Sequence, residues 1–142
     1  MIIADIQTLI DKNLETFLLS YIEVFERVQH YELVLSEGTV ETPAAIDSAM
    51  KELVALYSTL NTATALIKAK TTVNDARAYI QFKDQSNGLK TTETYIRSQV
   101  DLACAPYHRI CAIMESSRDN CDRMISVLQS SLKHAEREKA IQ

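Results

Sequence analysis

The feature that constrains this chain most is the spacing of apolar residues over its first 35 positions. They recur in nine steps from Ile3 to Leu35, at about 3.6 residues per step, which is the period of one face of an α-helix. A half-buried strand would instead place apolar residues at every second position. We therefore expect a long helix over about 2–36.

A second long helix is predicted after Gly38. Glycine accepts the left-handed conformation that commonly ends a helix, so the first helix should stop there. Thr42 suits the position before a helix, and Pro43 suits its first turn, where the missing N–H costs nothing. Apolar residues at helical spacing follow from Ile46 and weaken beyond residue 67, through Val73, Ala76 and Ile80. This helix should span about 43–85.

Two more helices complete the predicted fold. Gly88 marks a break, and Thr92 with Glu93 offers a capping hydroxyl and an acid in the first turn of a short helix over about 92–104. Pro106 fits the first turn of a C-terminal helix over about 106–138. Its apolar face runs from Ile110 to Leu132.

The scarcity of turn-forming residues supports the same fold class. Only two Gly and two Pro occur among 142 residues, too few for the many turns of an all-β protein or for a glycine-rich nucleotide loop. The length favours one domain over 1–142. We expect an all-α, elongated bundle of about four helices: two long antiparallel helices, one short helix and one long C-terminal helix. The broad apolar face of the first helix, wider than a coiled-coil seam, indicates two packing neighbours and favours a homo-oligomer.

The first residues, the apolar runs and the cysteines of the chain indicate a protein of a reducing compartment. The first five residues contain Asp5 and no basic region, and no apolar run reaches the roughly 18 residues of a membrane helix. We expect a cytoplasmic protein without a membrane partner. Cys104, Cys111 and Cys121 form no CxxC pair, so they are interpreted as buried, reduced core thiols.

The sequence offers no recognisable catalytic or cofactor motif. Cys104, His108 and Cys111 have helical spacing suited to a soft metal, but Pro106 interrupts the geometry and no fourth ligand stands nearby. Core cysteines beside a surface histidine are the better interpretation. Glu-x-x-His motifs of di-iron bundles do not occur. We expect no enzyme activity, no metal and no cofactor, although a site assembled between subunits stays open.

Charge is distributed unevenly along the chain. The net charge is −4, with ten acids and three bases in residues 1–56, three acids and six bases in 57–100, and six of each in 101–142. A basic segment in an acidic protein indicates an anionic partner for that segment, the alternative being a solvated surface. The pI of about 5.4 argues against duplex DNA as the main ligand.

The basic segment has the residue types of a single-strand binder. Basic side chains there interleave with Tyr79, Phe82 and Tyr95, and such proteins combine cations that track phosphates with rings on which bases stack. Helical spacing places Lys68, Tyr79 and Lys83 on one face, and Lys70 and Arg77 on another. The alternative is that Tyr79 and Phe82 belong to the core. The candidate nucleic-acid-binding residues are Lys68, Lys70, Arg77, Tyr79, Lys83, Lys90 and Arg97.

Part of the chain resembles a known family. Residues 75–83 (DARAYIQFK), 88–97 (GLKTTETYIR), Tyr107 and 127–132 (VLQSSL) look like the UvsY-type recombination mediator proteins of bacteriophages, over about 70–135. The resemblance implies a small helical protein that assembles into a ring-like oligomer and binds single-stranded DNA. It also implies help to a RecA-like recombinase in displacing single-strand-binding protein, in the host cytoplasm if the chain is phage-encoded.

One position departs from the family pattern. The basic Lys-Ala-Arg element of the family falls on Asp75-Ala76-Arg77, so an aspartate replaces the lysine. The family's DNA site is carried over only as Arg77, with Lys83 and Lys90 as neighbours. A carboxylate beside a phosphate site repels DNA unless Lys68 and Lys70 supply the missing charge.

Two functions follow as hypotheses. The first is a phage-type accessory protein of DNA recombination or replication that binds single-stranded DNA and assists recombinase loading. The alternative is a non-enzymatic helical protein–protein interaction module, such as a scaffold, assembly chaperone or inhibitor, without nucleic-acid binding. A metal or redox protein built on Cys104, His108 and Cys111 is the least favoured.

Overall fold

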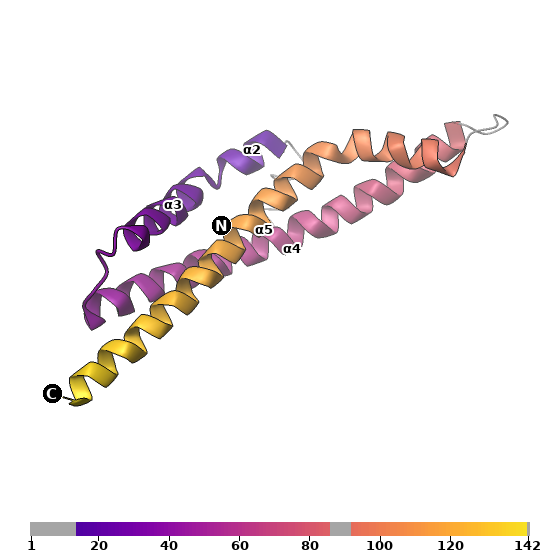
Figure 1. The fold of residues 1–142 in the computed structure, drawn as a ribbon. Coiled ribbons are helices and arrows are strands. Elements are labelled where there is room, and N and C mark those ends of the chain that lie inside the picture. The colour runs from indigo at the N-terminus through magenta and orange to yellow at the C-terminus, as the bar shows by residue number, and fades with distance from the viewer. Residues whose placement is uncertain (1–13, 86–91, 142) are drawn as a thin grey trace. The chain divides into compact units, whose positions relative to one another are not determined.

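The described part of the chain is entirely α-helical in its regular structure. The computed structural model describes residues 14–85 and 92–141, and these contain four helices and no strand (Figure 1). The all-α fold class predicted from the apolar spacing is confirmed. The helices are α2 (Leu14–Leu19), α3 (Ile22–Ser36), α4 (Pro43–Gln85) and α5 (Glu93–Ile141).

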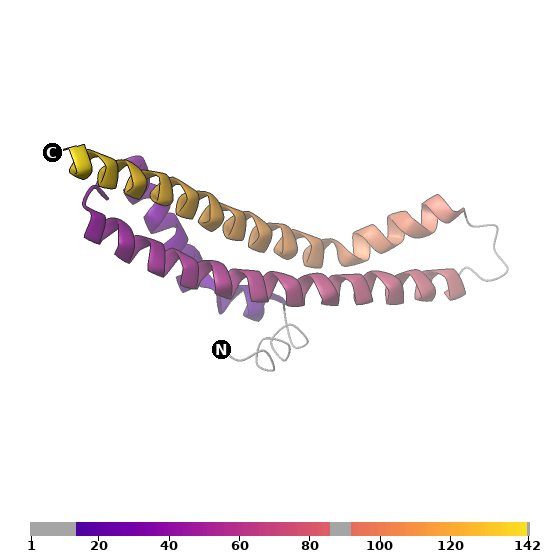
Figure 2. The same ribbon diagram turned by 90° about the horizontal axis from the view of Figure 1, so that it is seen from below.

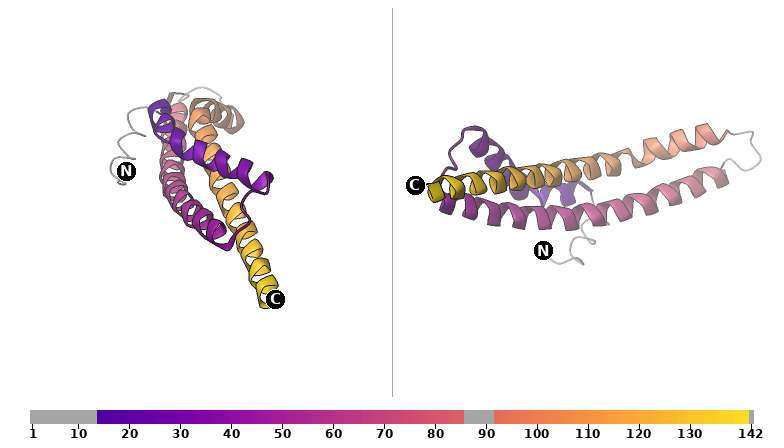
Figure 3. Two further views of the ribbon diagram at one scale, coloured as in Figure 1. Left: turned by 90° about the vertical axis from the view of Figure 1, so that its left-hand side faces the viewer. Right: turned by 60° about the horizontal axis from the view of Figure 1, so that its bottom comes forward.

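Contacts between residues divide the chain into two compact units. Of the described residues, unit 1 contains 14–18, 63–85 and 92–113, and unit 2 contains 19–62 and 114–141. The long helices α4 and α5 each contribute one segment to each unit, and within unit 1 these segments run antiparallel, side by side (Figures 2 and 3). The single domain over 1–142 stays a prediction.

Each unit buries its own set of apolar side chains. In unit 1, α2 supplies Phe17, which is fully buried, and the remainder comes from α4 and α5. In unit 2, all three contributing helices supply core residues, as the spacing of apolar residues predicted. The buried apolar residues of unit 1 are Phe17, Ala63, Ile67, Ile96, Val100, Cys104, Ile110 and Cys111. Those of unit 2 are Tyr21, Val28, Tyr31, Ile46, Ala49, Leu53, Leu60, Met114, Cys121, Met124 and Leu128.

The structure bears out the two capping threonines, Thr42 and Thr92. The Thr42 hydroxyl accepts a hydrogen bond from the backbone N–H of Ala45 at 3.2 Å, one residue before α4 begins. The Thr92 hydroxyl does the same for the N–H of Tyr95 at 3.2 Å, before α5. Each threonine therefore satisfies one of the N–H groups that a helix start leaves without an intrahelical partner.

Gly38 ends α3 as predicted. Its φ is +69°, the left-handed region. The N–H of Gly38 donates to the Leu35 carbonyl at 3.3 Å, and the N–H of Thr39 donates to the Val34 carbonyl at 3.4 Å. This pair of bonds is the Schellman motif, which satisfies the last carbonyl groups of a helix.

The predicted first helix is interrupted. Over the described residues it forms two helices, α2 and α3, separated by a turn at Ser20 and Tyr21. The Tyr21 backbone, at φ −103° and ψ 6°, lies in the bridge region between helix and extended structure, while its ring is buried in unit 2. Neither Gly nor Pro marks this turn, so nothing in the local sequence indicates it. Residues 2–13 of the predicted helix lie outside the described residues.

The predicted break before Pro106 is wrong. The expected helices over 92–104 and 106–138 are one helix, α5, with Pro106 inside it, and α5 bends within unit 1 (Figure 2). A proline inside a helix removes one backbone hydrogen bond, here to the carbonyl of Leu102, and favours a bend. Leu102 is 72% exposed, so water can reach this turn, while buried Cys104 and Ile110 hold the helix on both sides of the proline.

The second half of α4 does not follow its apolar spacing into the core. Val73 and Ile80 are 44% and 59% exposed, and Ala76 between them is also exposed. The last buried residue of α4 is Thr71, whose hydroxyl donates to the Ile67 carbonyl at 2.7 Å. Beyond it, polar side chains make the described contacts from α4 to α5.

Gly38, with its left-handed backbone conformation, provides a test of the turn that follows α3. A β-carbon at Gly38 would meet no atom within 4 Å, so substitution costs conformational energy and no steric clash. We predict that Gly38→Ala lowers the free energy of unfolding by about 1 kcal/mol. Gly38→Asn should cost less, because asparagine tolerates this conformation. Chemical denaturation measures both, and an alanine variant as stable as the natural chain would contradict the turn.

Candidate nucleic-acid interface

The described candidate residues all lie in unit 1. Five of them are on α4: Lys68, Lys70, Arg77, Tyr79 and Lys83. Arg97 is on the first turns of α5, and Lys90 lies outside the described residues. Lys68, Arg77, Lys83 and Arg97 are exposed, whereas Lys70 and Tyr79 are half-buried.

Tyr79 gathers charged side chains from both helices. Its hydroxyl donates to the Glu93 carboxylate, at 3.0 Å from Oε1 and 2.9 Å from Oε2. The ammonium of Lys83 and the guanidinium of Arg97 lie over its ring, 5.7 and 5.6 Å from the centroid. Both distances allow an attraction between cation and ring. We call Tyr79, Lys83, Glu93 and Arg97 the Tyr79 cluster.

Helical spacing explains how the Tyr79 cluster forms. Tyr79 and Lys83 are four residues apart on α4, and Glu93 and Arg97 are four apart on α5, so each pair shares one helix face. The Arg97 Nε lies 3.3 Å from the Glu93 Oε1 in an exposed ion pair. Glu93, which joins the two pairs, was not among the predicted site residues. Its position in the first turn of α5 was the only signal, and it indicated capping alone.

The structure does not bring the remaining basic residues into the Tyr79 cluster. Arg77 lies two residues before Tyr79 and Lys70 nine residues before it, which places both near the opposite face of α4. Lys68 lies eleven residues before Tyr79, on its face but three turns away. The predicted division of the basic residues into two faces of α4 follows directly from the continuous helix over 43–85.

The Tyr79 ring is not the most accessible aromatic of the segment. Two cations already lie over it, and its hydroxyl is bonded to Glu93. Tyr95 on α5 is 55% exposed. Phe82 is half-buried, so it is neither a core residue nor an open platform. A stacking role for Tyr79 stays a prediction, and the Tyr95 ring is more accessible to a nucleobase.

Asp75 makes contacts within unit 1. Its Oδ1 lies 3.1 Å from the His108 Nε2 on α5, and it accepts a hydrogen bond from the Cys104 thiol. Burial, and then this carboxylate, raise the pKa of the Cys104 thiol from 9.0 to about 11. The carboxylate is therefore used in contacts between α4 and α5.

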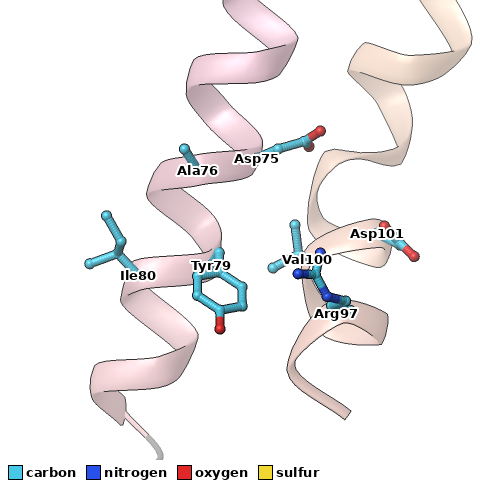
Figure 4. A pocket seen from close by; sticks show the side chains of 7 residues that line it. All are labelled: Asp75, Ala76, Tyr79, Ile80, Arg97, Val100 and Asp101. Carbon is cyan, nitrogen blue, oxygen red and sulfur yellow. The ribbon is translucent and has the colours of Figure 1, made fainter. Parts of the chain in front are cut away.

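A groove lies between the two helices beside Asp75 and Tyr79. Figure 4 shows Asp75 and Tyr79 on the side of α4 that faces Val100 and Arg97 of α5, with Ala76 and Ile80 farther from α5. Nothing in the spacing of the sequence indicated a groove, because it depends on how α4 and α5 are aligned. Its lining residues are Asp75, Ala76, Tyr79, Ile80, Arg97, Val100 and Asp101.

The residues considered for a metal site have other surroundings. Cys104 and Cys111 are buried and in no disulfide, and His108 pairs with Asp75. In the described ranges, no group of three or more His, Cys, Asp or Glu side chains has a geometry that could hold a metal ion. Cys121, also buried and in no disulfide, belongs to unit 2, where burial, and then Glu32, raise its pKa from 9.0 to about 11.

Unit 2 contains a separate polar contact that the sequence did not indicate. Glu52 on α4 accepts hydrogen bonds from the Arg27 Nε at 2.7 Å and from the Tyr31 hydroxyl, both on α3. Burial, and then the bond to Glu52, raise the pKa of Tyr31 to about 12, and the bond from Tyr31 lowers the pKa of Glu52. These contacts connect α3 to α4 within unit 2.

Comparison with known proteins leaves the residues as the sole guide to function. The chain matches no protein-family model, no curated protein and no solved structure. None of the helices in residues 14–85 and 92–141 has a stretch apolar enough to span a lipid bilayer.

The raised thiol pKa values predict a loss of stability in alkali. Cys104 and Cys121 ionise near 9.0 when unfolded and near 11 when folded, so ionisation favours the unfolded chain. Their contribution to stability is complete below about pH 8 and falls as the pH rises from about 9 towards 11. Urea denaturation at a series of pH values should show this decline. In C104A/C121A the decline should be shallower, and an unchanged slope would contradict the burial of the thiols.

Proposed function

We propose that this chain is a non-enzymatic accessory protein that binds single-stranded DNA through the basic residues of 68–97. The observation that carries the proposal is the exposure of Lys68, Arg77, Lys83 and Arg97 on two helices of one unit, in a chain whose net charge is −4. Exposed basic side chains attract the phosphates of DNA and displace the counterions bound to the strand. This displacement gives most of the affinity of non-specific binding.

The surroundings of Asp75 support this proposal. The acid that replaces the family's lysine is paired with His108 and Cys104. A carboxylate so engaged repels a phosphate less than one pointing freely to solvent, because its partners supply a compensating dipole or charge. Lys68 and Lys70 lie one to two turns earlier on α4 and add positive charge to the segment.

Capture of the strand is electrostatic, with stacking as a second contribution. Basic side chains on both faces of α4 contact phosphates, and the exposed Tyr95 ring offers a surface to a base. Several copies of the chain in a homo-oligomer would multiply weak sites through effective concentration. A role in recombination, with a RecA-like recombinase and single-strand-binding protein as partners, rests on the resemblance to UvsY-type mediators alone.

A protein–protein interaction module is the second candidate, and one observation favours it. Apolar side chains are exposed along unit 1, among them Val73, Ile80 and Leu102, and Ile80 also lines the groove between α4 and α5. Exposed apolar surface of this kind is common where a helical protein meets a partner. This function requires no basic segment, so reversal of its charges should leave it intact.

Charge reversal in the basic segment tests the leading proposal. We predict that the natural chain binds a fluorescently labelled single-stranded oligonucleotide, with a log–log salt dependence of roughly 2–4, as about four phosphate contacts require. Changing Lys68, Lys70, Arg77 and Lys83 together to Glu should weaken binding roughly a hundredfold or more. Fluorescence anisotropy at low and near-physiological salt measures both.

A matched variant separates local binding from net charge. Lys51, Lys133, Arg137 and Lys139 are exposed bases of unit 2, and their combined change to Glu alters the net charge by the same amount. Affinity should then fall much less. Equal losses in the two variants would mean that the segment is no specific interface. Absence of binding by the natural chain at low salt would leave the protein-binding module as the better function.

A further inference from the structure

We propose that Glu93 is an internal competitor for the phosphate of single-stranded DNA. Its carboxylate holds the Tyr79 hydroxyl and the Arg97 guanidinium in the unbound protein, and a phosphate of the bound strand takes its place. The inference rests on the proposed function and identifies the residue that limits the affinity of that same surface.

The contacts of Glu93 are those of an anion in a binding site. Both carboxylate oxygens lie within 3.0 Å of the Tyr79 hydroxyl, and one lies 3.3 Å from the Arg97 Nε. A phosphate oxygen accepts hydrogen bonds from the same two donor types, and arginine pairs with either anion. The Lys83 ammonium, over the Tyr79 ring, adds a cation on the same cluster. The Tyr79 cluster is thus a group of donors whose present acceptor belongs to the chain itself.

The exchange is energetically accessible because the ion pair is exposed. The side chains of Arg97 and Glu93 are 70% and 55% exposed. An ion pair in such surroundings contributes little, because water screens it and two long side chains must be ordered. The Glu93 side chain can therefore turn towards solvent when a phosphate of the strand approaches Arg97.

Other acids near this surface are not placed to compete in the same way. Asp75 is bonded to His108 and Cys104. Asp101 lines the groove beside Arg97, but the described contact of Arg97 with a carboxylate is with Glu93. Removal of the Glu93 charge should therefore increase binding more than removal of the Asp75 or the Asp101 charge.

Glu93→Gln tests the inference, since it keeps the shape and the hydrogen-bond acceptor while removing the charge. We expect E93Q to bind a labelled single-stranded oligonucleotide roughly threefold to tenfold more tightly than the natural chain at low salt. The log–log salt dependence should rise by about 0.7, the value for one additional phosphate contact on a single strand. In E93Q/R97A the gain should disappear, because Arg97 is the group that Glu93 releases.

The matched control is Asp47→Asn in unit 2. Asp47 pairs with Lys51 four residues on, at 3.0 Å, in another exposed ion pair on a helix, and its removal changes the net charge equally. D47N should alter affinity less than twofold. Thermal melts followed by circular dichroism should show E93Q and D47N folded, with a small loss for E93Q because Glu93 lies in the first turn of α5.

The outcomes separate this inference from the proposed function. Binding by the natural chain with no gain in E93Q, or with an equal gain in D47N, overturns the competitor and leaves the function standing. Weaker binding by a folded E93Q also overturns it, since Glu93 would then position Arg97. If neither the natural chain nor E93Q binds at low salt, the proposed function itself fails. Binding by E93Q alone would support the competitor role of Glu93 and count against the proposed function, because the natural chain would then not bind the strand.

Discussion

Burial of one face of α4 is the interaction on which the rest of the structure depends. Its buried positions run from Ile46 through Leu53 and Leu60 into Ile67, and they supply core residues first to unit 2 and then to unit 1. Each such side chain contributes about 1.5–3 kcal/mol when fully removed from water. This face aligns α3 with α4 in unit 2 and α5 with α4 in each unit, so the polar pairs between helices take their positions from it.

The end of this apolar face at Thr71 gives the last part of unit 1 a different character. Asp75 and Tyr79 connect α4 to α5 by polar contacts, while Val73 and Ile80 are exposed. Exposed polar pairs stabilise a fold much less than buried apolar contacts. They are also easier to exchange for the groups of a ligand. A surface that combines basic side chains, replaceable ion pairs and apolar groups is suited to binding either single-stranded DNA or another protein.

Local signals were sufficient where a feature depends on one residue and its immediate neighbours. Gly38, Thr42 and Thr92 mark a helix end and two helix starts because conformational freedom and a capping hydroxyl act within a single turn. Local signals failed at Tyr21, where a helix is interrupted without Gly or Pro, and at Pro106, where it continues despite a proline. In both places packing outweighs the preference of the local sequence.

The sequence alone determined the helical fold class, the burial of Cys104, Cys111 and Cys121, and the segment in which bases gather, because periodicity and composition carry that information. Only the tertiary structure decided what the charged groups contact. Tyr79 and Glu93 are 14 residues apart, and Asp75 and His108 are 33 apart. Such pairs depend on the alignment of α4 with α5, which is set by the packing of side chains over the whole interface and by no short stretch of the chain.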